Sequence, residues 1–242
     1  MTDSLRGKRA LIVGGSGGIG AAVTDILASE GCDLFVHGGH DHGKLEDVGE
    51  RARERGVRVS TILASLTSAD DGLSLLQRVG SVDVLVVSFG PLITAPLHQT
   101  GRNDWRMLIE LNFLLPSLMV SHLLPSMRAN TFGRILLFGG PRSDELSGFH
   151  SIGAYAAAKS GLASLTRSVA LQNAQHNITC NMIAPGYVET EYYGRDRIAE
   201  LSSAMPTGRM VSRAEVARLA LFLLAGDVEP VNGAIIPMDF GR

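Results

Sequence analysis

Tyr155 and Lys159 lie four residues apart in the segment Tyr-Ala-Ala-Ala-Lys, and together they could act on one bound molecule. The flanking apolar pattern predicts a helix, on which positions i and i+4 share one face. A free tyrosine keeps its proton up to a pH of about 10, but a nearby cation stabilises the phenolate and lowers that pKa. The pair is therefore a candidate for proton transfer near neutral pH. The alternative interpretation is a half-buried aromatic ring beside a solvated lysine.

A glycine-rich segment, residues 14–20, follows an apolar run and opens a helical pattern. Glycines at such a place let the backbone turn tightly and approach a pyrophosphate, whose charge the helix N-terminus then faces. The Lys-Ser/Thr ending of a P-loop is absent, so a dinucleotide is the expected ligand and a plain tight loop is the alternative. The expected cofactor contacts here are Gly14, Ser16, Gly17, Gly18, Ile19 and Gly20.

Strands and helices that would position these residues alternate along the chain. Short apolar runs predict buried strands at 9–13, 34–37, 57–63, 82–87, 134–138, 178–183 and 234–237. Apolar residues at helical spacing predict helices over 19–29, 69–78, 104–127, 154–175 and 213–224, with Pro116 kinking or restarting the third. This alternation predicts an α/β fold, a doubly wound three-layer Rossmann fold with a seven-stranded parallel sheet.

Composition narrows the class of protein. With 242 residues, 45% of them hydrophobic, the chain can bury a large core, and no linker or repeat divides residues 1–242, so we expect a single domain. A net charge of −2 and a pI near 6.4 give no footprint for nucleic acid. The apolar runs are too short to span a bilayer, and no apolar leader precedes them, so we expect no membrane partner and a cytoplasmic protein. Neither the two cysteines nor the seven histidines have ligand spacing, and no metal is expected.

Several motifs, in order, give the chain a resemblance to the short-chain dehydrogenase/reductase family, and most closely to its 3-oxoacyl-[acyl-carrier-protein] reductase-like members. The resemblance covers nearly the whole chain and implies NAD(P)-dependent hydride transfer between nicotinamide and a carbonyl or secondary alcohol, in a homotetramer or homodimer. The matching motifs are Gly14-x-x-x-Gly18-x-Gly20, Asn112, Tyr155-x-x-x-Lys159, Asn181-x-x-x-Pro185-Gly186 with Thr190, and Asn232-Gly233 to Asp239.

The resemblance also implies roles for individual residues. Tyr155 would be the general acid that protonates the carbonyl oxygen, and Lys159 would bind the nicotinamide ribose and lower the pKa of the tyrosine. Asn112 would bend its helix and hold a water in the proton path, unless it is an ordinary amide that satisfies backbone groups. Pro185, Gly186, Val188 and Thr190 would line the nicotinamide side of the cofactor site.

The sequence departs from the family pattern where a serine usually binds the substrate carbonyl. Gly140 stands nearest that position, and Ser143, three residues later, could take over if the turn folds inward. Ser151 or a substrate hydroxyl is a further alternative. Without an oriented donor the rate would fall by about a hundredfold or more. The runner-up function is therefore a nucleotide-binding, weakly active or inactive member of the family.

Further departures affect the cofactor site. Val13 replaces a usual threonine and should leave the glycine turn less restrained, while the run Ser88-Phe89-Gly90 replaces a usual Asn-Ala-Gly. Ser65, followed by Leu66, stands where an acid or amide commonly contacts adenine. The cofactor contacts expected from these segments are Ser65, Leu66, Ser88 and Gly90.

The choice between the two nicotinamide cofactors depends on the end of the second strand. Carboxylates there favour NAD and basic residues favour NADP, and the sequence has His37, Gly38 and His40 with no carboxylate at the strand end. We therefore expect NADP(H), with cofactor contacts at His37, Gly38 and His40 and with its phosphate bound by His40 or Lys44. NAD(H) is the alternative. A small carbonyl or alcohol substrate should lie under residues 189–210, a charged stretch expected to be a loop, although nothing in the sequence identifies that substrate.

Overall fold

The computed structural model describes residues 3–225 and 229–241. A seven-stranded sheet in the order β3-β2-β1-β4-β5-β6-β9 forms its centre, and all neighbouring strands in it are parallel. This sheet confirms the predicted fold class. The strands are β1 (Arg9–Val13), β2 (Asp33–Gly38), β3 (Val59–Leu63), β4 (Val84–Val87), β5 (Gly133–Phe138), β6 (Ile178–Pro185) and β9 (Ile235–Met238), and a separate short pair is formed by β7 (Val188–Glu189) and β8 (Val211–Ser212).

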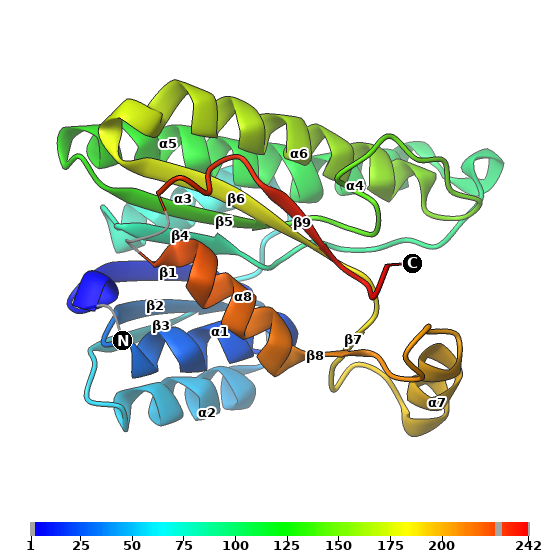
Figure 1. Cartoon of the computed structure of the whole chain (residues 1–242), viewed down its shortest axis with the longest axis horizontal. Coiled ribbons are helices and arrows are strands. Elements are labelled where there is room, and N and C mark those ends of the chain that lie inside the picture. The colour runs from blue at the N-terminus through cyan, green and yellow to red at the C-terminus, as the bar shows by residue number, and fades with distance from the viewer. Residues whose placement is uncertain (1–2, 226–228, 242) are drawn as a thin grey trace.

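Helices cover both faces of this sheet (Figure 1). Alternation along the strands explains why, since Ala10 and Ile12 of β1 face one apolar core while Leu11 and Val13 face the other. The first core holds α1 (Gly18–Ser29), α2 (His42–Arg53) and α8 (Arg213–Leu224), and the second holds α3 (Ala69–Val79), α5 (Leu115–Ala129) and α6 (Gly153–Asn173). The remaining α-helices of the described residues are α4 (Arg102–Ile109) and α7 (Arg195–Ser203).

Strand order places a topological switch point at the carboxyl end of β1. The chain leaves β1 for its neighbour β2 on one side, and β4 and the later strands lie on the other. At such a reversal the connections diverge to opposite faces and leave a gap, in which α/β proteins bind their ligands. The glycine turn after β1 and residues 88–90 after β4 both border this gap.

Two helices were not predicted. α2 is polar, and its start is set by Asp41, whose side chain accepts a hydrogen bond from the Lys44 N–H. α7 lies within residues 189–210, which the sequence indicated as a loop, and it projects from the body of the molecule together with the β7–β8 pair (Figure 1). Both helices consist mostly of charged and polar residues, so their few apolar residues do not show a clear helical period.

The long helix predicted over 104–127 is interrupted. A π-helical turn, Glu110–Leu114, separates α4 from α5 and contains Asn112. Pro116 falls in the first turn of α5, where its missing N–H costs no helical hydrogen bond. Asn112 and Pro116 therefore mark the interruption, as expected.

Among the described residues, one helical stretch, Arg102–Ala129, is long and apolar enough to cross a membrane, which the short apolar runs did not indicate. Residues of this stretch, among them Leu111, Leu115 and Met119, pack in the second core against α3 and α6. A core helix has the same composition, so the stretch is explained by burial against the sheet on one side.

Candidate active site

Tyr155 and Lys159 lie in the first two turns of α6, against the carboxyl end of β5. The Lys159 Nζ donates a hydrogen bond to the Phe138 carbonyl at 2.8 Å, and the Tyr155 Oη lies 3.5 Å from the Gly139 carbonyl. The Nζ is 5.6 Å from the centroid of the Tyr155 ring. The helix thus brings the two groups to one place, as their spacing predicted.

The pKa of Tyr155 differs from the expectation. Burial raises the pKa of this phenol above its ordinary value, and the nearby Tyr193 adds to the rise. Lys159 does not offset this effect, because its ammonium donates to a backbone carbonyl and is itself buried, which lowers its pKa to about 8. The lowered tyrosine pKa implied by the family resemblance is therefore absent from this structure.

The burial of Lys159 predicts a pH dependence of stability. Between pH 8 and about 10 the folded protein has lost the Lys159 proton while the unfolded chain, with an ordinary lysine pKa, retains it, so stability rises with pH. From pH 7 to 9.5 the free energy of unfolding should rise by roughly 2 kcal/mol more in the wild type than in Lys159→Met. Urea unfolding at the two pH values measures this, and equal changes in both proteins would contradict it.

Asn112 lies beside this pair from the π-helical turn. Its side chain is fully buried, and its Nδ2 donates to the Pro91 carbonyl at 2.9 Å. Its Oδ1 is buried with no hydrogen-bond partner among the described residues. A Cβ atom on Gly90 would collide with this Oδ1 and lie 3.3 Å from the Lys159 Nζ, so the amide oxygen and the ammonium flank one glycine. Buried acceptors nearly always have a hydrogen-bond partner. A functional site explains why this one, beside a lysine, has none.

Gly140 leaves no room for the family serine. A Cβ atom at this position would lie 2.5 Å from Cε1 of Tyr155 and 3.2 Å from its hydroxyl oxygen, so the phenol ring fills the space. Ser143 is buried, and its Oγ accepts from the Gly140 N–H and donates to the Gly140 carbonyl, both at 2.8 Å. A substrate contact by Ser143 stays a prediction, and it requires the hydroxyl to turn away from that carbonyl.

The glycine turn is held by hydroxyls rather than left loose. Ser88 Oγ donates to the Val13 carbonyl at 2.9 Å and lies 3.3 Å from that of Gly14, so it supplies the restraint that Val13 lacks. The expectation of a less restrained turn was wrong, because the tie comes from the neighbouring strand β4. Gly14 and Gly18 have φ angles of 79° and 52°, and a Cβ atom on Gly20 would collide with the Gly14 carbonyl.

His37 is a structural residue and not a cofactor contact. The ring is buried, its Nδ1 accepts from the Gly14 N–H at 3.2 Å, and its Nε2 then donates to the Ala64 carbonyl at 2.8 Å. Burial lowers the pKa of this imidazole, so the ring is neutral at physiological pH. His37 therefore links the ends of β1, β2 and β3 behind the glycine turn, and its buried ring is not available for the cofactor contact that the sequence suggested.

The other residues expected near the adenosine end follow the carboxyl ends of β2 and β3. His40 is exposed, and Lys44 lies 3.8 Å from Asp41. Ser65 is exposed with its Oγ 3.5 Å from the Gly39 carbonyl, whereas Leu66 is buried in the second core. Gly38 approaches Ser16, since a Cβ atom on it would lie 2.9 Å from the Ser16 Oγ. Leu66 can therefore offer only backbone to a ligand.

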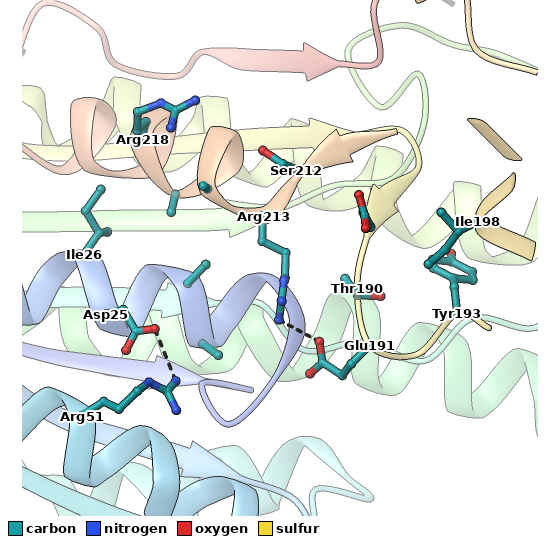
Figure 2. Close-up of a pocket in the computed structure, with 15 residues that line it drawn as sticks. Asp25, Ile26, Arg51, Thr190, Glu191, Tyr193, Ile198, Ser212, Arg213 and Arg218 are labelled. Carbon is teal, nitrogen blue, oxygen red and sulfur yellow. Dashed lines mark hydrogen bonds and ion pairs between the residues drawn. The ribbon is translucent and has the colours of Figure 1, made fainter. Parts of the chain in front are cut away.

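A carboxylate that sequence reasoning missed lies on the glycine turn. The Gly18 N–H donates to Glu191 Oε1 at 2.8 Å, and Arg213 Nη1 is 2.8 Å from Glu191 Oε2 (Figure 2). The Gly18 N–H at the start of α1 therefore binds the Glu191 carboxylate, an anion. A pyrophosphate is also an anion and binds such N–H groups, so the turn fits a dinucleotide. No sequence signal indicated Glu191, because its contact spans 173 residues of the chain.

The segment before Glu191 borders the same turn. Gly186 N–H donates to the Met238 carbonyl at 3.0 Å, which fixes Pro185–Gly186 beside β9. Val188 is buried in β7, and a Cβ atom on Gly18 would lie 3.6 Å from Thr190 Cγ2. A cavity of about 1000 Å³ lies on the other side of this segment, between α1, α7 and α8, and neither Tyr155 nor Lys159 lines it.

Comparison with known proteins agrees with this geometry. Residues 8–200 match the short chain dehydrogenase family. The chain belongs to this family. It is 32% identical to a cis-4-hydroxycyclohexanecarboxylate dehydrogenase of Sinomonas cyclohexanicum, over 100% of this chain and 98% of that one. It is 29% identical to a gluconate 5-dehydrogenase of Gluconobacter oxydans, over 98% and 95%. A 3-oxoacyl (acyl-carrier-protein) reductase of Agrobacterium tumefaciens, solved with NADP bound, superposes with a TM-score of 0.91 at 29% identity, over 100% and 96%.

Membership of this family defines the reaction class. The short chain dehydrogenase described here is an oxidoreductase that transfers hydride between a nicotinamide cofactor and an alcohol or carbonyl group of a small molecule. Among the described residues, no group of three or more His, Cys, Asp or Glu side chains could hold a metal ion.

Proposed function

We propose that this short chain dehydrogenase is an NADP-dependent carbonyl reductase in which Tyr155 exchanges a proton with the substrate oxygen. The observation that carries this proposal is the position of Tyr155 and Lys159 on one face of α6, at the carboxyl end of β5. Only β4 separates β5 from β1, the strand that leads into the glycine turn. A carbonyl bound against the phenol would lie within reach of a cofactor on that turn.

Each polar side chain has a task in this mechanism. When bound, NADPH supplies the hydride. Tyr155 donates the proton to the carbonyl oxygen, and the Lys159 ammonium holds a ribose hydroxyl and, once cofactor and substrate are in place, makes phenolate formation less costly. The Asn112 Oδ1 is buried and unpaired next to that ammonium. In this mechanism it accepts a hydrogen bond from the water that returns a proton to Lys159. Gly90 and Asn112 therefore shape the path by which the tyrosine is reprotonated.

A second candidate is a nucleotide-binding family member with little or no turnover. Gly140 favours it, because the serine that usually binds the substrate oxygen is absent and the Tyr155 ring fills its space. A panel of ketones and secondary alcohols, assayed by nicotinamide absorbance with both cofactors, separates the two candidates. Robust turnover of any substrate excludes the second, and cofactor binding with no turnover across the panel favours it.

We propose NADP(H) as the preferred cofactor. The support is the absence of a carboxylate at the end of β2 and the exposure of His40 and Lys44 beside it. Fluorescence titration should give an NADPH dissociation constant at least tenfold below that of NADH, a difference of about 1.4 kcal/mol. A tenfold preference for NADH would contradict this assignment.

We also propose a homotetramer, or else a homodimer, of chains that each form one domain over residues 1–242, located in the cytoplasm. Apolar side chains exposed along α4 and the π-helical turn support the assembly, since a partner chain would cover them. They are Trp105, Ile109 and Leu114. Light scattering measures the assembly, and a monomer at micromolar concentration would contradict it.

A further inference from the structure

Glu191 and Tyr192 cover the part of the glycine turn where a cofactor pyrophosphate would bind. The Gly18 N–H donates to Glu191 Oε1, and a Cβ atom on Gly17 would lie 2.9 Å from this oxygen and collide with the Tyr192 hydroxyl. Tyr192 also lies over Gly18, with its Cε2 3.1 Å from a Cβ atom placed there. Lys44 Nζ is 5.8 Å from the centroid of the Tyr192 ring. The segment thus closes over the anion-binding end of α1.

Glu191 places a negative charge where the cofactor pyrophosphate would bind. Burial raises the pKa of its carboxyl, but the hydrogen bond from Gly18 and the charges of Arg213 and Lys44 outweigh burial, and the pKa lies below its ordinary value. The side chain is therefore an anion at neutral pH. A pyrophosphate on the same N–H group would occupy the same space and be repelled by a charge only a few ångströms away.

The structure also provides a place for the displaced side chain. The cavity of about 1000 Å³ lies directly behind the segment and is lined by Thr190, Glu191 and Tyr193 together with three arginines. Arg213 already binds the second carboxylate oxygen from that side (Figure 2). Glu191 can therefore leave Gly18 while keeping its ion pair with Arg213. The arginines that line the cavity are Arg51, Arg213 and Arg218.

We propose that Glu191 is an internal competitor for the cofactor: its carboxylate occupies the pyrophosphate position of the glycine turn, and the dinucleotide binds only after Glu191 withdraws toward Arg213. This inference rests on the proposed use of the turn for a dinucleotide. Because residues 190–193 continue into α7, the same displacement repositions the segment that we expect to cover the substrate. Cofactor binding is thereby coupled to the substrate side of the site.

Competition of this kind weakens the apparent affinity for the cofactor, because only molecules whose turn is not covered by Glu191 can bind it. The apparent dissociation constant is the intrinsic one divided by the fraction of such molecules. If Glu191 covers the turn in about nine molecules of ten, its removal should lower the NADPH dissociation constant about tenfold. Glu191→Ala removes the acceptor, and Glu191→Gln removes the charge but keeps the size, so the alanine variant should gain at least as much. Glu54→Gln is the matched control, because Glu54 is exposed at the end of α2 and does not line the cavity, and this variant should stay within about twofold of wild type.

The experiment titrates NADPH and NADH fluorescence on the four purified full-length proteins, with thermal unfolding as a check that each is folded. A second measurement titrates inorganic pyrophosphate alone by calorimetry, and it should bind Glu191→Ala more tightly than wild type. Unchanged or weaker NADPH binding in both Glu191 variants would overturn the inference while leaving the proposed function in place. NADPH binding by the Glu191→Ala protein, with none by the other three proteins, would support the inference. Absence of binding in all four proteins, with either cofactor, would overturn both.

Discussion

Tyr155→Phe should reduce turnover by about a thousandfold or more while leaving NADPH affinity within about twofold of wild type. The substitution removes only the hydroxyl that exchanges the proton. Its one hydrogen bond, to the Gly139 carbonyl, is long at 3.5 Å, so little stability is lost with it. Steady-state kinetics on the best substrate of the panel, together with a cofactor titration, measures both effects.

Lys159→Met is the companion variant for this test. It should lower turnover and also weaken cofactor binding, because Lys159 holds the ribose in the proposed mechanism. A Tyr155→Phe protein that retained a tenth of wild-type turnover would show that another group donates the proton.

Gly140→Ser restores the residue that the family usually carries, and we nevertheless expect turnover to fall about a hundredfold. The new Cβ atom would lie 2.5 Å from Cε1 of Tyr155, well inside van der Waals contact, so the phenol ring must shift. A displacement of about 1 Å in a reacting group costs on the order of a hundredfold in rate. The serine hydroxyl cannot compensate while the proton donor is out of place.

Gly140→Ala separates the two effects of that substitution. It introduces the same Cβ atom without a hydroxyl, so we expect a similar loss of turnover, with NADPH affinity unchanged. Turnover above wild type in Gly140→Ser, but not in Gly140→Ala, would contradict the steric argument and show that the missing hydroxyl limits the enzyme.

The order of elements and the proximity of Tyr155 and Lys159 followed from local pattern alone. Apolar runs such as 9–13 and 134–138 became β1 and β5, because a strand buried on both faces must be apolar throughout. Tyr155 and Lys159 were placed together correctly because helical spacing fixes their relative direction. α2 and α7 were missed, since their polar sequences carry too little apolar period to indicate a helix.

The chemistry around those residues was decided by contacts between distant segments. The pKa of Tyr155 is raised rather than lowered because α6 presses the phenol against the turn after β5, where Lys159 finds a backbone carbonyl instead. His37 is a structural link because its ring nitrogens bond to Gly14 and Ala64, which directly follow β1 and β3. No local pattern contains these partners.

The sequence by itself determined the parallel sheet, the glycine turn and the tyrosine–lysine pair, because each depends on residues close together in the chain. Only the tertiary structure decided what restrains the turn, what fills the place of the missing serine, and what covers the anion site. Ser88 reaches Val13 across 75 residues and Glu191 reaches Gly18 across 173. Burial, charge and steric exclusion at a site depend on many residues that are distant in the sequence, and only the folded chain brings those residues together.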